Sequence, residues 1–218
     1  MLRGDIAEGT RLLLIRHGET EWNRDQRVQG HQDVPLSETG REQARRLRDW
    51  LHAEPDVIYT SDLQRAWTTA EILAHNAVGV IPEVRLREVG MGRFEGLSIR
   101  EIRLKFPVAW TAWRQDAIRH RPPGGETLED LQARVFAAVG DRLPCHPGQT
   151  VALVTHAGVV RVLVCGLLRV GLEVYPHLRV DNASITRFEF RAQGPSLVAF
   201  NEVGHLRDSA AGAEEGDR

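Results

Sequence analysis

The sequence predicts an α/β domain whose central sheet is mostly parallel. Short apolar runs alternate with longer stretches of helical periodicity in the first third of the chain. This alternation is typical of parallel strands joined by right-handed crossovers. With 218 residues and an apolar content of 42%, one domain can bury a sizeable core. We therefore expect a single domain over residues 1–206.

The first predicted elements follow one another closely. In chain order they are a strand at 12–15, a helix at 38–52, a strand at 57–59, a helix at 62–74 and a strand near 78–81. The run at 12–15 is apolar throughout, as in a strand that is buried on both faces. Ser61 followed by Gln64 forms a capping-box pattern, so we expect Ser61 to cap the second helix.

The middle of the chain, residues 88–125, breaks this alternation. It contains several glycines, two short helical stretches and the turn sequence Pro122-Pro123-Gly124-Gly125. Ser98 and Glu101 repeat the capping-box pattern for a helix that begins at residue 99. We predict an excursion over the edge of the sheet.

The remaining elements complete the sheet. They are a helix at 128–139, a strand at 151–154, a mostly apolar and therefore buried helix at 158–168, and strands at 184–191 and 196–201. The last two strands predict a hairpin at the sheet edge. Residues 207–218 are rich in Ala, Gly, Glu and Asp and lack large apolar side chains, which predicts a disordered tail.

Composition excludes several classes of function. A formal charge of -2 with interspersed signs gives no basic face for nucleic acid. No apolar run is long enough for a membrane span and the first residues do not resemble a signal peptide, so we predict a cytoplasmic protein without membrane contact. Cys145 and Cys165 lack the spacing of a disulfide framework or a zinc site, so no metal is expected.

Two histidines follow apolar runs in the same way. Arg16-His17-Gly18 comes after the run at 12–15, and His156-Ala157-Gly158 comes after the run at 151–154 and before a helix. Ligands of parallel sheets bind beyond the carboxyl ends of the strands, where a helix start also offers amides to an anion. Arg65 begins the helix after another strand. The sequence therefore predicts one anion pocket that contains all of these groups.

Several spaced motifs resemble the histidine phosphatase superfamily, the phosphoglycerate-mutase-like proteins. The resemblance runs from about residue 12 to residue 201. Its motifs are Arg16-His17-Gly18-Glu19-Thr20 with Trp22-Asn23, Ser61-Asp62-Leu63-Gln64-Arg65-Ala66, Glu88 with Glu95-Gly96, Gly124-Gly125-Glu126-Thr127, and Thr155-His156-Ala157-Gly158. It implies a three-layer α/β/α sandwich and a phosphohistidine mechanism that needs neither metal nor cofactor.

The same resemblance assigns roles to individual residues. It implies that His17 is the nucleophile and Glu88 the proton donor. Arg16, Arg65 and His156 would form the phosphate pocket, and Asn23 would be a further phosphate contact. Further substrate-binding candidates are Gln29 and Gly30 in the loop after the first motif, and Ala157 at the helix start.

Elementary chemistry agrees with these assignments. A phosphomonoester dianion needs several donors, which two arginines, an imidazole and helix amides supply. The arginine charges should lower the pKa of His17 from about 6.5 and so keep its ring neutral. The leaving alkoxide needs a proton, and the resulting carboxylate can then activate water. Glu88 fits both roles, Glu95 competes for them, and Glu19 is expected to be structural.

Other residues keep two interpretations. Trp110 and Trp113 either line a substrate mouth or pack in the core, whereas core packing is favoured for Trp22. Glu126 either organises the pocket rim or points into solvent. We expect the remaining histidines to lie on the surface, and these include His31, His120 and His177.

We favour a phosphatase of small phosphorylated metabolites over two alternatives. Mutases of this family resemble one another in a longer segment between the acid and the second histidine. Because the segment between Glu88 and His156 is short, we expect it to admit water, and water hydrolyses phosphohistidine. The alternatives are a phosphoglycerate mutase primed by 2,3-bisphosphoglycerate and a non-catalytic phospho-ligand-binding protein. The sequence identifies neither the natural substrate nor the oligomeric state, and a homodimer remains open.

Overall fold

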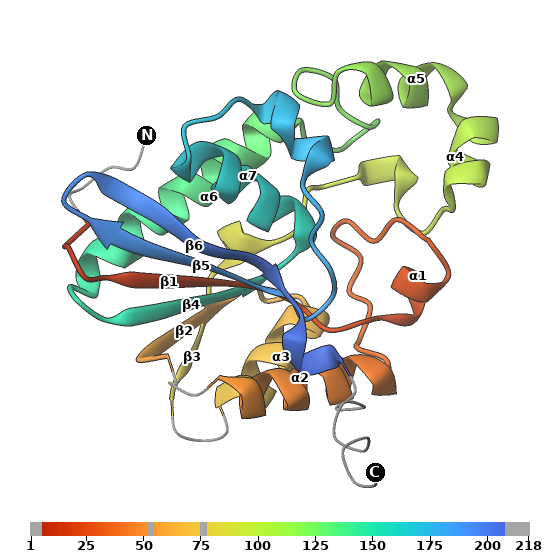
Figure 1. The fold of residues 1–218 in the computed structure, drawn as a ribbon. Helices are drawn as coiled ribbons and strands as arrows, with labels where there is room; N and C mark the ends of the chain where they lie inside the picture. The colour runs from red at the N-terminus through yellow and green to blue at the C-terminus, as the bar shows by residue number, and fades with distance from the viewer. Residues whose placement is uncertain (1–5, 52–54, 75–77, 208–218) are drawn as a thin grey trace, which may run out of the picture.

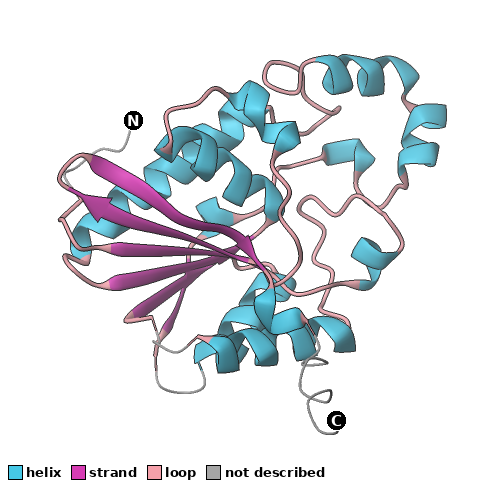
Figure 2. Ribbon diagram, in the orientation of Figure 1, coloured by secondary structure: helices cyan, strands magenta, loops and turns pink. Residues whose placement is uncertain are grey.

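The central element of the fold is a six-stranded sheet, which a computed structural model describes for residues 6–51, 55–74 and 78–207 (Figure 1). The strands are β1 (Arg11–Arg16), β2 (Val57–Thr60), β3 (Val80–Pro82), β4 (Thr150–Thr155), β5 (Ile185–Arg191) and β6 (Gly194–Glu202). Their order is β3-β2-β4-β1-β5-β6. The first four are parallel, and β5 and β6 form an antiparallel hairpin at one edge (Figure 2). The predicted sheet and its hairpin edge are confirmed.

Four of the described helices cover the two faces of this sheet. In chain order the described helices are α1 (Glu21–Arg24), α2 (Glu38–Trp50), α3 (Gln64–Ala74), α4 (Ile99–Lys105), α5 (Pro107–Gln115), α6 (Leu128–Arg142) and α7 (Ala157–Leu167). Helices α2 and α3 lie on one face of the sheet, and α6 and α7 lie on the other (Figure 1). Leu12 and Leu14 of β1 pack with α6 and α7, whereas Leu13 and Ile15 pack with α2 and α3. This alternation follows from the period of two along a strand. The predicted α/β/α sandwich is therefore confirmed.

Of the two predicted capping boxes, one is present and the other is not. Ser98 caps α4 in the expected capping box with Glu101. Ser61 does not, because α3 begins at Gln64 and the Gln64 side chain bonds to Asp33 instead, at 3.0 Å. The predicted capping box was therefore wrong: Ser61 Oγ accepts from the Leu63 amide at 3.3 Å and from His156, which is distant in sequence, at 2.9 Å.

Other boundaries shift by a few residues. Helix α6 runs to Arg142, beyond the expected end at residue 139, and α2 ends at Trp50, whereas His52 lies outside the described residues. The short helix α1 was not predicted, although Thr20 and Asn23 form a capping box at its start. Of the expected tail, only Arg207 is described.

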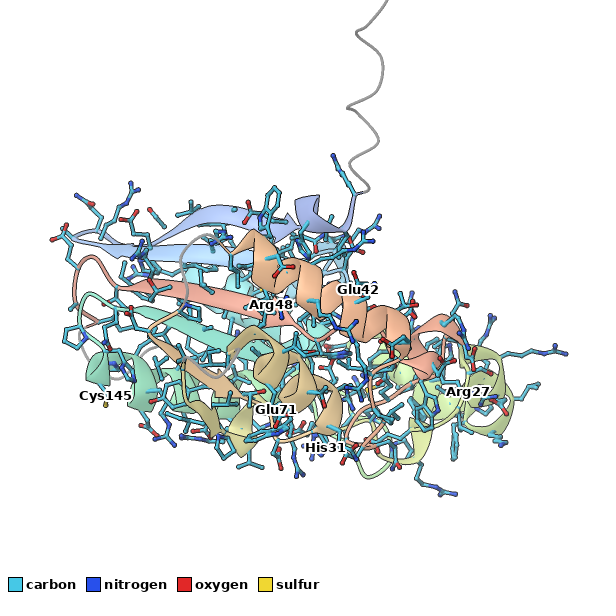
Figure 3. The ribbon with its side chains drawn as sticks, turned by 90° about the horizontal axis from the view of Figure 1, so that it is seen from below. Arg27, His31, Glu42, Arg48, Glu71 and Cys145 are labelled. Atoms are coloured by element: carbon cyan, nitrogen blue, oxygen red, sulfur yellow. The ribbon has the colours of Figure 1, made fainter. Side chains whose placement is uncertain are left out.

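Residues 88–125 leave the sheet and carry α4 and α5 to one side of the molecule (Figure 1). We call this segment the excursion. Phe94 and Ile102 are buried and anchor it, whereas Val108 is 83% exposed. A backbone bridge between Arg27 and Ser98 joins it to the loop after β1, and Figure 3 shows Arg27 at this end of the molecule. The excursion thus stands beside the carboxyl ends of the parallel strands.

None of the described helices has the length and apolarity that a membrane span requires.

Candidate active site

A cavity of about 210 Å³ opens where β1 ends and the excursion begins. Seven of the predicted site residues line it, namely Arg16, His17, Asn23, Gln29, Gly30, Arg65 and Glu88. His156 and Ala157 do not line it. Six further residues complete the wall: Arg27, Val28, Val89, Met91, Trp113 and Tyr175. Of these six, only Trp113 was a candidate from the sequence, and it had two interpretations.

His17 directly follows β1 and is 3% exposed. Its Nδ1 lies 2.7 Å from the carbonyl oxygen of Gly18. Because a carbonyl only accepts, Nδ1 must carry the ring proton, and Nε2 keeps its lone pair. Burial, followed by the charges of Arg65 and Arg16, holds the pKa of His17 well below 6.5, although the Gly18 carbonyl opposes this. The ring is therefore neutral, and its Nε2 lone pair is free of protein partners among the described residues.

His156 lies beside His17, with ring centroids 5.1 Å apart. Its Nδ1 accepts a hydrogen bond from Arg65 Nε at 3.3 Å, so its Nε2 carries the proton and donates to Ser61 Oγ at 2.9 Å. Burial and then Arg65 lower the pKa of His156 well below 6.5. Both ring nitrogens of His156 are thus hydrogen-bonded to protein groups. The ring supports Arg65 from behind and does not line the cavity. Ser61 was missed as its partner.

The two arginines are buried cations held by carbonyl oxygens. Arg65 is 0% exposed and donates to Gln32 at 2.7 Å and to Gly30 at 2.8 Å. Arg16 donates to the carbonyl of Val180 at 2.7 Å. Burial lowers the pKa of each to about 10, so both stay charged at neutral pH. The Nε of Arg16 is buried and has no hydrogen-bond partner among the described residues.

The loop candidates are held in distinct ways. Asn23 Oδ1 accepts bonds from the Thr20 amide and from Asn182, both at 3.1 Å, which leaves its NH₂ end for the cavity. Gln29 is 8% exposed, and its Oε1 is buried without a hydrogen-bond partner in the described chain. Gly30 has φ +52°, and a side chain there would collide with Glu95.

The Glu88 carboxylate sits on the amino end of α7. Oε1 accepts from the amides of Val89 at 2.8 Å and Gly158 at 3.1 Å, and Oε2 lies 3.2 Å from the Gly158 amide. The dipole of a helix favours an anion at this end. We expected such helix amides to serve the phosphate, but the structure gives the Gly158 amide to Glu88.

The backbone of Glu88 is fixed from the other side. Its carbonyl accepts from Arg134 at 2.7 Å and from His31 Nε2 at 2.8 Å. The His31 side chain is 37% exposed, as expected of a surface residue, and in addition it holds the backbone of Glu88. Glu126 binds Arg134 at 2.8 Å and the Gly90 amide at 2.7 Å, as its rim-organising interpretation requires.

Glu95, the competitor of Glu88, has a different position. It accepts hydrogen bonds from the amides of His31 at 2.9 Å and Met91 at 3.0 Å, and it does not line the cavity. These contacts connect the loop after β1 to the excursion. In the described ranges, no group of three or more His, Cys, Asp or Glu side chains could hold a metal ion.

Comparison with known proteins agrees with this geometry. The model of the histidine phosphatase superfamily (branch 1) matches residues 12–203. Phosphoserine phosphatase 1 of Hydrogenobacter thermophilus is 34% identical over 198 residues, which cover 90% of this chain and 94% of that protein. Phosphoglycerate mutase-like protein 4 of Arabidopsis thaliana is 38% identical over 214 residues, covering 94% and 89%.

A solved structure agrees as well. The mycobacterial glucosyl-3-phosphoglycerate phosphatase in complex with VO3 superposes with a TM-score of 0.80 at 34% identity. The match covers 88% of this chain and 98% of that one. The chain belongs to the histidine phosphatase superfamily.

Proposed function

We propose that this member of the histidine phosphatase superfamily hydrolyses small phosphomonoesters through a phosphohistidine on His17, with Glu88 as general acid and base and without a metal ion. One observation carries the proposal. A buried, neutral His17 with a free Nε2 shares a cavity with two arginine cations and one carboxyl group. The phosphatase names of two similar proteins support the reaction class.

In the first step, His17 Nε2 attacks phosphorus while Arg16 and Arg65 hold the charge of the phosphoryl oxygens. The buried guanidiniums are already oriented by carbonyl groups, so little reorganisation is needed during the reaction. The bond from phosphorus to the ester oxygen breaks, and that oxygen takes a proton from Glu88. His156 holds Arg65 in position through Nδ1.

In the second step, Glu88 as carboxylate takes a proton from water, which attacks the phosphohistidine. His17 leaves as the neutral ring, and Nδ1 keeps its proton and donates it in a hydrogen bond to the Gly18 carbonyl throughout. Asn23 and Gln29 would contact the phosphoryl group from the loop after β1. Gly30 would act through its carbonyl, which holds Arg65, and Ala157 only as the start of α7.

The phosphohistidine is the part to test first. The protein is mixed with p-nitrophenyl phosphate without added metal, quenched in alkali and analysed for acid-labile phosphate on His17. Wild type should give both turnover and the adduct, whereas His17→Ala should give neither. His120→Ala, which changes an exposed histidine, is the control. Full turnover by His17→Ala would refute the mechanism.

Because one similar protein is named as mutase-like, phosphoglycerate mutase activity is the alternative to test. Interconversion of 3-phosphoglycerate and 2-phosphoglycerate is measured with and without 2,3-bisphosphoglycerate. A phosphatase should release inorganic phosphate and interconvert these esters slowly. Rapid interconversion that depends on the bisphosphate would replace the proposal with a mutase.

A further inference from the structure

Tyr175 lies outside every sequence motif, yet it lines the catalytic cavity. It belongs to a short 3-10 helix, Leu172–His177, that packs on α7. Arg161 of α7 places its guanidinium carbon 5.2 Å from the centroid of the Tyr175 ring and donates to the Leu178 carbonyl at 2.8 Å. The ring therefore has a fixed place against the helix that carries Glu88 on its amino end.

The hydroxyl of Tyr175 and the carboxylate of Glu88 both lie close to Gly158. A methyl group built on Gly158 would lie 2.2 Å from Glu88 Oε1 and 3.1 Å from the Tyr175 hydroxyl oxygen. Both groups thus occupy the side of Gly158 where that methyl would stand. An ester oxygen placed between the two groups can therefore take a proton from Glu88 and a hydrogen bond from Tyr175.

The hydroxyl keeps its proton under working conditions. Burial, followed by the charge of Glu88, raises the pKa of Tyr175 to about 12, although Arg161 opposes this. A phenol in this state is a hydrogen-bond donor. Such a donor can stabilise negative charge that develops on a nearby oxygen as an ester bond breaks.

We infer that Tyr175 is a further catalytic residue, which donates a hydrogen bond to the bridging ester oxygen while Glu88 protonates that oxygen. The inference rests on the proposed function, because it takes Glu88 as the acid. The electron pair of the broken phosphorus–oxygen bond stays on the leaving oxygen, and the proton comes from Glu88. Tyr175 stabilises the developing charge and keeps its own proton.

This role predicts a dependence on the leaving group. The leaving group of an alkyl phosphate is a strongly basic alkoxide, which needs both the proton from Glu88 and the hydrogen bond from Tyr175. p-Nitrophenolate is a stable anion and needs little help from either. Removal of the donor should therefore slow the alkyl ester selectively, whereas damage to the fold would slow both esters alike.

The test compares two single-atom deletions. Tyr175→Phe removes the hydroxyl and keeps the ring on Arg161. Tyr59→Phe is the matched control, because the chain has two tyrosines and the hydroxyl of Tyr59 bonds to His146 at 2.9 Å, outside the cavity. The value of kcat/KM is measured for glycerol 2-phosphate and for p-nitrophenyl phosphate, because it reports the steps up to phosphoryl transfer. Thermal unfolding checks that each variant is folded.

For Tyr175→Phe we expect kcat/KM of the alkyl ester to fall about 10²-fold, as for loss of one transition-state donor, and that of p-nitrophenyl phosphate to fall much less. Tyr59→Phe should lower neither value. Equal losses on both esters, or no loss on the alkyl ester, would overturn the inference.

Glu88→Gln separates this inference from the proposed function. It should discriminate between the two esters in the same direction as Tyr175→Phe. If Glu88→Gln discriminates and Tyr175→Phe does not, only the role of Tyr175 fails. If Glu88→Gln does not discriminate, the acid assigned under the proposed function fails as well.

Discussion

The two walls of the cavity are built differently. The phosphate wall, formed by Arg16, His17 and Arg65, belongs to the sheet ends and the helix start behind them, and Arg65 is 0% exposed. The excursion wall comes from the part of the excursion that follows Glu88 and includes Met91 and Trp113, whereas Glu88 itself lies at the junction of the two walls. Helix α5, which carries Trp113, has no fully buried residue.

Under the proposed function, we expect this difference to separate the chemistry from the selection of the ester. Groups that the core fixes can hold buried charges in one geometry, which electrostatic catalysis requires. The α5 part of the excursion wall, which has no buried residue, can change its shape without disturbing the sheet. We therefore expect changes in the phosphate wall to alter the rate on all esters, and changes in the excursion wall to alter which ester is preferred.

The largest effect should come from Arg65. Arg65→Ala removes a buried cation from the phosphate wall and also releases His156, so the rate should fall about 10²- to 10³-fold on every ester. Steady-state hydrolysis of several esters measures this loss. Arg45→Ala, on the exposed face of α2, should keep the wild-type rate. A loss confined to one ester would contradict the division between the walls.

A substitution at Gly158 tests the position of Glu88, which lies at the junction of the two walls. The side chain of Gly158→Ala would press on Glu88 Oε1, and the flexible carboxylate would have to move. We expect kcat/KM to fall about 10²-fold, within the range for misplaced acid–base groups, with little change in the unfolding midpoint. Gly79→Ala, where a methyl meets open space, is the control. Wild-type activity in Gly158→Ala would show that the Glu88 position is not critical.

The buried histidines should make stability depend on pH. The folded pKa values of His17 and His156 lie below 6.5, so the unfolded chain binds more protons as the pH falls through 6.5. The free energy of unfolding should then decrease by about 1.4 kcal/mol per pH unit for each histidine. His205, whose pKa burial also lowers, acts in the same direction.

Urea unfolding at several pH values between 7 and 5 measures this slope. The pKa of Glu83, held at about 2 mainly by Arg85, affects stability only below its ordinary value of 4.5. The window above pH 5 therefore isolates the histidines. In His17→Asn the slope should be smaller by about 1.4 kcal/mol per pH unit, and an unchanged slope would place the titration elsewhere.

The smallest effect should come from the excursion wall. Trp113→Ala should change KM less than about tenfold and differently for different esters, because a single packing contact contributes about 1 kcal/mol. The value of kcat should change little. Val108→Ser, at a position that is 83% exposed, is the control and should alter neither activity nor stability. A uniform loss of kcat in Trp113→Ala would show that this wall contributes to the chemical step and not only to the choice of ester.

Local signals predicted the sheet and most of the phosphate wall. The run before His17 is apolar at every position, and its burial on both faces follows from that. His17 and His156 both follow such runs, so their proximity could be inferred from the parallel sheet. Arg65 stands in the first turn of α3, as its helical pattern required.

The missed features depend on contacts between distant residues. Ser61 has a local capping pattern, but its hydroxyl oxygen accepts a hydrogen bond from His156, 95 positions later. Tyr175 lies in a short 3-10 helix without amphipathic periodicity, and only the packing on α7 brings it to Glu88. His31 reaches the Glu88 carbonyl across a separation of 57 positions. Sequence spacing carries no information about such pairings.

The buried charge of the phosphate wall has a consequence for handling the protein. Burial lowers the pKa values of Arg16 and Arg65 to about 10, so the pocket holds these two cations at a free-energy cost. An oxyanion that relieves this cost binds the folded chain alone and so shifts the unfolding equilibrium by mass action. The melting temperature should rise with the concentration of inorganic phosphate. Thermal-shift screening with tetrahedral and planar anions would then rank ligands for the pocket before any substrate is known.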